Sequence, residues 1–212
     1  MTFEIFFSST IWIFLAIGAA SLGRGKLREN IRISRTNLSF SIVLISVICF
    51  CVTSIILNIG ISETFSNSIE GEVFKELSLS SLTVTQKVKI FVLIGIVSAL
   101  GEELFFRGLM LKLLSQWSSI PIAILVSSLA FGISHGNPGQ AVAAAILGVY
   151  LGVLTIQAKS VRPAVTAHIA NNTLFLFWGT SINESKVIWV TLWLALVVLL
   201  IKWSCSNSRQ CK

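Results

Sequence analysis

One apolar stretch of the chain holds three charged residues: residues 97–109 read VSALGEELFFRGL, with Glu102, Glu103 and Arg107 inside it. The apolar run around them continues to about Leu114 and is long enough to cross a bilayer, which takes about 20 residues of helix. On insertion scales each charge at mid-bilayer costs about 2.5–3.5 kcal/mol. We therefore predict a membrane helix whose buried charges serve a function.

The composition of the whole chain favours the same environment. Hydrophobic residues make up 54% of the 212 residues, charged residues only 12%, and the mean hydropathy is +0.86. A soluble domain carries about 25% charged residues, and a disordered chain needs low hydrophobicity, so both classes are excluded. Seven spans of about 20 residues would use about 140 residues and leave only loops. We expect one integral membrane domain, residues 1–212.

Seven apolar runs predict an all-α polytopic bundle of about seven transmembrane helices. The fourth and sixth runs are short, and each could be re-entrant instead of a full span. A turn is expected at residues 136–139, which read GNPG, and residues 62–86 form a polar loop or a short interfacial helix. The runs are about Ile5–Leu22, Leu38–Ile61, the run after Lys89 to Leu114, Ile120–His135, Gln140–Gln157, Pro163–Gly179 and Val187–Trp203.

Charge predicts the orientation of this bundle and argues against nucleic acid as a partner. The net charge is +7, and the basic residues lie mostly in loops, where they set topology and meet anionic lipid headgroups. With seven spans the acidic 62–86 loop falls opposite most of them, so the positive-inside rule places the N-terminus outside and the C-terminus inside. The basic residues that share a side are those of residues 24–35, Lys112, Lys159, Arg162, Lys202, Arg209 and Lys212, whereas Lys87 and Lys89 are exceptions.

The two adjacent carboxyl groups are expected to play different parts. Glu103 and Arg107 are four residues apart, so they share a helix face and can pair, whereas Glu102 points about 100° away. Desolvation strengthens a carboxylate as a base, which suits Glu102 to general acid–base work. In the alternative interpretation the pair only locks helix packing and Glu102 faces a headgroup. Lys112 marks the inner end of this helix, about 15 Å along the axis from Glu102. Glu102 therefore lies too deep in the membrane to reach a headgroup easily.

The two histidines of the chain both lie in apolar runs. His135 ends the fourth run, and His168 lies in the sixth, four residues before Asn172 on the same face. Asn172 could orient a water or donate to an oxyanion; alternatively it makes an interhelical hydrogen bond, worth about 0.6 kcal/mol in membranes. Because hydrolysis needs a base, an oxyanion donor and an acid, these groups together with Glu102 predict a hydrolytic site in a water-containing cavity.

Three motifs in this order resemble those of the CPBP (CAAX protease and bacteriocin-processing, Abi/Rce1-like) family of intramembrane endopeptidases. The resemblance extends over about residues 90–180, which we expect to be the catalytic core. The motifs are Glu-Glu-x-x-x-Arg at Glu102, Glu103 and Arg107, Phe-x-x-x-His at Phe131 and His135, and His-x-x-x-Asn at His168 and Asn172.

The resemblance implies a glutamic-type peptidase without a metal cofactor. Glu102 would activate a water, with Glu103 as a further catalytic carboxylate, and His135, His168 and Asn172 would line the same cavity. Arg107 and Phe131 would support them. Zinc is the minor alternative, since two histidines and a glutamate could bind it, although the chain has no H-E-x-x-H motif.

The predicted function is hydrolysis of a peptide bond in a membrane-associated or lipidated protein or peptide. A prenylated substrate and a leader, bacteriocin or anchored peptide fit equally well, and membrane lipid is the other expected partner. The location would be a bacterial plasma membrane or a eukaryotic endomembrane, multi-pass. Two alternatives stay open: a non-catalytic immunity or assembly partner on the same scaffold, and a small proton-coupled transporter, although the chain lacks the repeat symmetry of many transporters.

Overall fold

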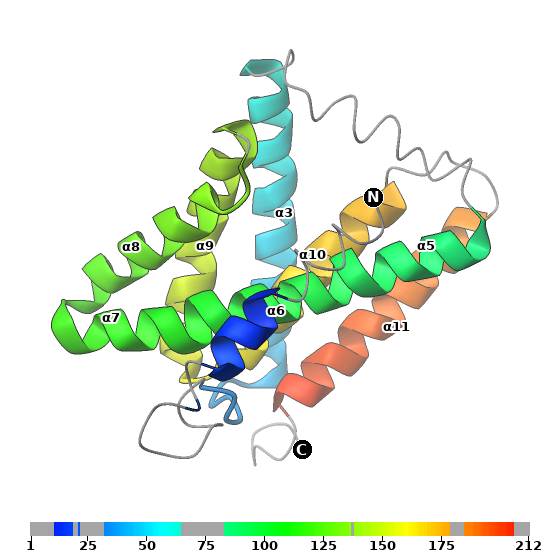
Figure 1. The fold of residues 1–212 in the computed structure, drawn as a ribbon. Helices are drawn as coiled ribbons and strands as arrows, with labels where there is room; N and C mark the ends of the chain where they lie inside the picture. Colours follow the sequence, from blue (N-terminus) through cyan, green and yellow to red (C-terminus); the bar gives the residue numbers. More distant parts are fainter. Residues whose placement is uncertain are drawn as a thin grey trace.

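The computed structural model describes residues 11–18, 21, 32–64, 83–136, 138–178 and 185–205, and this part is helical throughout, with connecting turns and no strand (Figure 1). The prediction of an all-α fold is confirmed for these residues. Residues 11–18 form a helix. The other elements are α3 (Phe40–Thr64), α5 (Val84–Ile90), η2 (Phe91–Ser98), α6 (Ala99–Glu103), η3 (Leu104–Met110), α7 (Leu111–Trp117), α8 (Ile120–Ile133), α9 (Pro138–Ala158), α10 (Arg162–Trp178) and α11 (Ser185–Cys205).

Most helix bounds agree with the predicted runs. α9 begins at Pro138, two residues before the expected start, as suits proline in a first helical turn. Of the turn predicted at residues 136–139, residue 137 lies outside the described residues and the last two belong to α9. Gly136 has a φ of 75°, a conformation that glycine adopts without steric cost. Most of the predicted 62–86 loop, the basic loop before residue 32 and the tail with Arg209 and Lys212 lie outside the described residues.

Two helices of the described part are long and apolar enough to cross a membrane, within Phe40–Leu57 and Pro138–Ala158. Two shorter apolar helices cover Ile120–Ile133 and Leu194–Ser204. α8 has 14 residues, about 21 Å at 1.5 Å per residue, which is less than the hydrocarbon thickness of about 30 Å. The number of spans and their orientation therefore stay predictions.

The third helix differs from its prediction in length and in winding. It runs without a break from Val84 to Trp117, and two parts of it, η2 and η3, are wound as π-helix on either side of α6. Such turns are rare and often occur at functional sites. The short α-helical piece between them carries both glutamates, so the change of winding surrounds the charged motif.

Glycines allow α8 to pack closely on α9. A Cβ atom on Gly132 would lie 2.5 Å from the carbonyl oxygen of Ala141, and one on Gly152 would lie 3.0 Å from Cγ2 of Ile124. α10 lies in the middle of the bundle, where it packs against α3, α9, α11, η2 and α6. This central helix brings the second histidine to the third helix.

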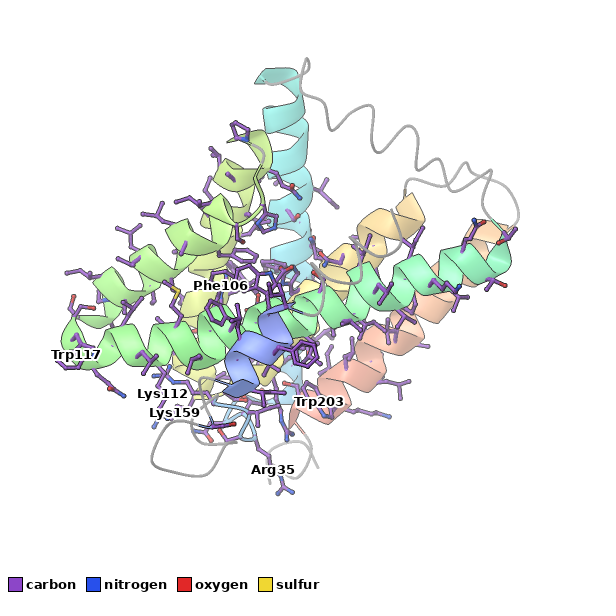
Figure 2. All side chains as sticks on the ribbon, viewed as in Figure 1. Arg35, Phe106, Lys112, Trp117, Lys159 and Trp203 are labelled. Atoms are coloured by element: carbon purple, nitrogen blue, oxygen red, sulfur yellow. The ribbon has the colours of Figure 1, made fainter. Side chains whose placement is uncertain are left out.

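Basic residues gather at one end of the molecule. The segment 32–39 is joined to the α9–α10 turn by hydrogen bonds from Val161 N–H to the Arg32 carbonyl (2.9 Å) and from Asn37 N–H to the Ala158 carbonyl (3.3 Å). Figure 2 shows Arg35, Lys112 and Lys159 toward this end, together with Trp203. These three basic residues thus lie toward one end of the molecule. That they share one side of a membrane, and that this side faces inward, stays a prediction.

Candidate active site

Glu103 and Arg107 form the predicted pair within the third helix. Nη1 of Arg107 donates to Oε1 of Glu103 at 3.1 Å, and neither side chain is exposed. Charged groups so deeply buried are stable only when paired, and removing one partner of such a pair costs about 3–5 kcal/mol. The pair therefore forms a fixed charged centre inside the bundle.

The guanidinium of Arg107 is enclosed by rings and by a glycine. Its Cζ lies 4.1 Å from the ring centroid of Phe131 on α8 and 5.9 Å from that of Phe106. On α9, a Cβ atom at Gly148 would lie only 2.9 Å from Nη2. Within the described residues, Nε and Nη2 of Arg107 and Oε2 of Glu103 have no hydrogen-bond partner. The cation is thus held more by the ring faces and by Glu103 than by a full set of hydrogen bonds.

His168 of α10 contacts both carboxylates. Its Nδ1 lies 2.9 Å from Oε1 of Glu103, and its Nε2 lies 3.8 Å from Oε2 of Glu102. A carboxylate only accepts, so Nδ1 carries the proton of the shorter bond, and a neutral ring presents an unprotonated Nε2 to Glu102. Glu103 therefore fixes both the orientation and the tautomer of His168.

Glu102 is the more accessible of the two acids. Its side chain is 14% exposed, whereas that of Glu103 is fully buried. The hydroxyl of Ser98 donates to Oε1 of Glu102 at 2.6 Å, which leaves Oε2 for His168 and for a reacting group. The sequence interpretation missed Ser98, although it lies four residues before Glu102 and so shares its face.

Phe131 links the two histidines. Its ring stands edge-to-face to His135, with centroids 4.8 Å apart, and to His168, with centroids 5.8 Å apart. His135 lies just past the end of α8, and its Nδ1 donates to the Phe131 carbonyl at 2.9 Å. The structure thus places His135 beside the ring that His168 also touches, with Nε2 as its remaining nitrogen.

Asn172 makes an interhelical hydrogen bond, which is the alternative that the sequence leaves open beside a role at the oxyanion. Its Nδ2 donates to the carbonyl of Ile94 in η2 at 3.2 Å, so one amide proton ties α10 to the first π segment. The second amide proton is still available to a substrate. The neighbouring Asn171 is buried, and its Oδ1 has no partner among the residues that the structure describes. The sequence interpretation gave Asn171 no role.

No group of three or more His, Cys, Asp or Glu side chains is arranged to hold a metal ion within the described segments. His168 would have only Nε2 to offer, because Nδ1 is directed at Glu103. Whether the chemistry is glutamic-type or depends on zinc stays a prediction.

Residues 84–174 match the model of a family described as Rce1-like, type II CAAX prenyl endopeptidase. This confirms the resemblance predicted from the three motifs, since the matched segment contains all of their residues. The match indicates a protease embedded in a membrane, in keeping with the apolar helices. The chain matches no curated protein and no solved structure.

Proposed function

We propose that the chain is an intramembrane endopeptidase in which Glu102 activates a water that cleaves a peptide bond of a membrane-associated or lipidated substrate. The observation that supports this most is the meeting of Oε2 of Glu102 with Nε2 of His168 at 3.8 Å, between two helices and inside the bundle. Ionisable groups within a membrane protein are expensive and usually functional. Here a carboxylate oxygen and an imidazole nitrogen face each other without bonding directly.

The gap between these two atoms suits one water. It is too long for a direct hydrogen bond, yet two ordinary hydrogen bonds of about 2.8 Å can meet at one oxygen above atoms 3.8 Å apart. Because a neutral His168 accepts at Nε2, such a water would donate one proton to Glu102 and the other to His168. Its lone pairs would then be free to attack a carbonyl carbon.

The chemical step proceeds through a tetrahedral intermediate. The water oxygen forms a bond to the peptide carbonyl carbon while Glu102 takes the water's proton, and the carbonyl π electrons move to the oxygen. When this oxyanion collapses, the C–N bond breaks and the proton on Glu102 passes to the leaving nitrogen. Donors for the oxyanion would be Nε2 of His135 or of His168, each once its ring is protonated, and the second amide proton of Asn172.

Glu103 and Arg107 would keep His168 ready for this step. Oε1 of Glu103 accepts from both Arg107 (3.1 Å) and His168 (2.9 Å), so the imidazole is held through one charged oxygen. Arg107 is the counter-ion of that carboxylate. The supporting pair therefore acts through His168 and need not touch the substrate.

The proposed substrate carries its own membrane anchor. The matched family is described as a CAAX prenyl endopeptidase. A lipid chain on the substrate would bring a cleavage site to an enzyme whose helices expose large apolar side chains such as Leu125 and Leu129. A farnesylated peptide is thus the first substrate to test. The same peptide without the lipid shows whether the anchor matters.

The experiment compares Glu102→Gln with the wild type on a fluorogenic farnesylated peptide in lipid vesicles. A general base contributes about 10²–10⁴-fold, so cleavage should fall by about 10³-fold. Glu63→Gln, at the end of α3, is a control for loss of a carboxylate elsewhere and should cleave normally. Undiminished cleavage by Glu102→Gln would refute the role of Glu102.

A further inference from the structure

We propose that the helix of residues 11–18, outside the family-matched segment 84–174, completes the active site, and that its Trp12 positions the two imidazoles. This inference rests on the proposed function. It adds a residue that none of the three motifs contains. Trp12 is a positioning residue here, because it acts through other aromatic side chains.

The helix of residues 11–18 is seated on the third helix directly beside Glu102. A Cβ atom on Gly101, the residue before Glu102, would lie 2.8 Å from Cγ1 of Ile13, 3.2 Å from its backbone nitrogen and 3.3 Å from Cβ of Trp12. A larger residue at this position would require Ile13 or the helix that carries it to shift. In Figure 1 the dark blue helix accordingly crosses α6. The two backbones therefore meet at the charged motif itself.

A chain of aromatic rings leads from this helix to both histidines. The Trp12 ring lies 5.0 Å from Phe105 and 4.9 Å from Phe106, centroid to centroid. Phe106 lies 5.3 Å from Phe131, which stands edge-to-face to His135 and His168. These distances are those of favourable aromatic pairs. Trp12 is thus two rings away from each imidazole.

The rings of Phe106 and Phe131, in the middle of this aromatic series, cannot move without moving their neighbours. Phe106 is 2% exposed and Phe131 is 3% exposed, and both rings also face the buried guanidinium of Arg107. Protein interiors are close-packed and transmit displacements of this kind. Removing the Trp12 ring would free Phe106 on one side and so loosen Phe131, on which the two imidazoles rest.

The same helix provides a matched control. Phe14 is 72% exposed, whereas Trp12 is partly buried against the third helix. The helix thus turns one aromatic residue toward the site and another away from it. A general weakening of the hydrophobic helix would follow from either substitution, but loss of imidazole positioning would follow only from the loss of Trp12.

The test compares Trp12→Ala, Trp12→Phe and Phe14→Ala in the full-length protein, with the farnesylated peptide in vesicles. We expect Trp12→Ala to lower kcat at least tenfold with KM changed less than twofold, because misplacement of catalytic groups by about 1 Å can cost 10²-fold. Trp12→Phe should restore most of kcat, and Phe14→Ala should match the wild type. Equal losses in Trp12→Ala and Phe14→Ala, or a change in KM alone, would overturn the proposal.

Two further variants keep this test decisive. If Trp12→Ala does not fold, Trp12→Leu keeps an apolar side chain but removes the ring, and the same loss of kcat is expected. Glu102→Gln is measured in parallel. If Glu102→Gln is inactive and the Trp12 variants are normal, the positioning role fails and the proposed function stands. If Glu102→Gln cleaves normally, the proposed function itself fails.

Discussion

Two polar regions of the molecule are built in different ways. At the basic end, Arg162 uses Nε on the carbonyl of Ile33 (3.2 Å) and Nη1 on the carbonyl of Trp203 (3.1 Å), and its guanidinium lies over the Trp203 ring. In the centre, Glu103 bonds to two other side chains and keeps one oxygen without a partner among the described residues.

The difference separates architecture from chemistry. At the basic end the side chain of Arg162 bonds to backbone carbonyls where a loop and a helix end meet, and helix ends leave carbonyls that need such partners. The central side chains satisfy one another incompletely, although an unsatisfied buried polar atom costs about 1–3 kcal/mol. A function explains why such an arrangement is kept. Substitutions in the charged centre should therefore lower activity more than stability. Substitutions at the basic end should lower stability alone.

Among substitutions in the charged centre, Glu103→Gln is expected to have the largest effect on cleavage and stability. Arg107 would lose its counter-ion and His168 its charged acceptor, so cleavage should fall about 10²-fold and stability by about 3 kcal/mol. Cleavage rates in vesicles and thermal unfolding of the purified protein measure the two losses. A stable Glu103→Gln protein with normal cleavage would show that the pair supports neither His168 nor the fold.

A smaller effect, confined to the centre, is expected from Gly148→Ala. The new methyl group would lie 2.9 Å from Nη2 of Arg107, which Phe131 and Glu103 hold in place. Moving the guanidinium would shift Glu103 and with it His168, so we expect kcat to fall about tenfold, as small displacements in a catalytic site do.

Gly152→Ala is the matched control for Gly148→Ala. Its methyl group would also press α9 against α8, at 3.0 Å from Ile124, but away from the charged centre. Overpacking of this kind costs about 1–3 kcal/mol of stability. Equal loss of kcat in both variants would mean that helix separation, and not the position of Arg107, matters.

The smallest effect on activity is expected at the basic end, from Arg162→Gln. Two hydrogen bonds from a charged donor would be lost or weakened, so the free energy of unfolding should fall by about 1–3 kcal/mol. Cleavage per folded molecule should change less than twofold. A tenfold loss of kcat without loss of stability would contradict the division between the two regions.

The sequence was sufficient for those features that depend on neighbours along the chain. Apolar runs predicted the helices, a glycine before Pro138 suited the positive φ found at Gly136, and the spacing of four predicted the pair of Glu103 with Arg107. All three follow from helix periodicity and turn chemistry, which act locally.

Features that depend on contacts between helices could not be predicted. Asn172 and His168 share a face, yet Asn172 reaches the Ile94 carbonyl while His168 reaches the carboxylates, which depends on how α10 crosses the third helix. The π winding of η2 and η3 leaves no sequence periodicity of its own. The contact of the helix of residues 11–18 with Gly101 joins segments that are far apart in the sequence.

The most direct test of the account is a double-mutant cycle of Glu102→Gln and His168→Gln, with kcat measured on the farnesylated peptide. If Oε2 of Glu102 and Nε2 of His168 hold one water, they act as a unit, and residues that act as a unit give strongly non-additive losses. We expect the double variant to be no slower than the slower single variant. Losses that multiply would show that the two side chains act independently and would contradict the shared water.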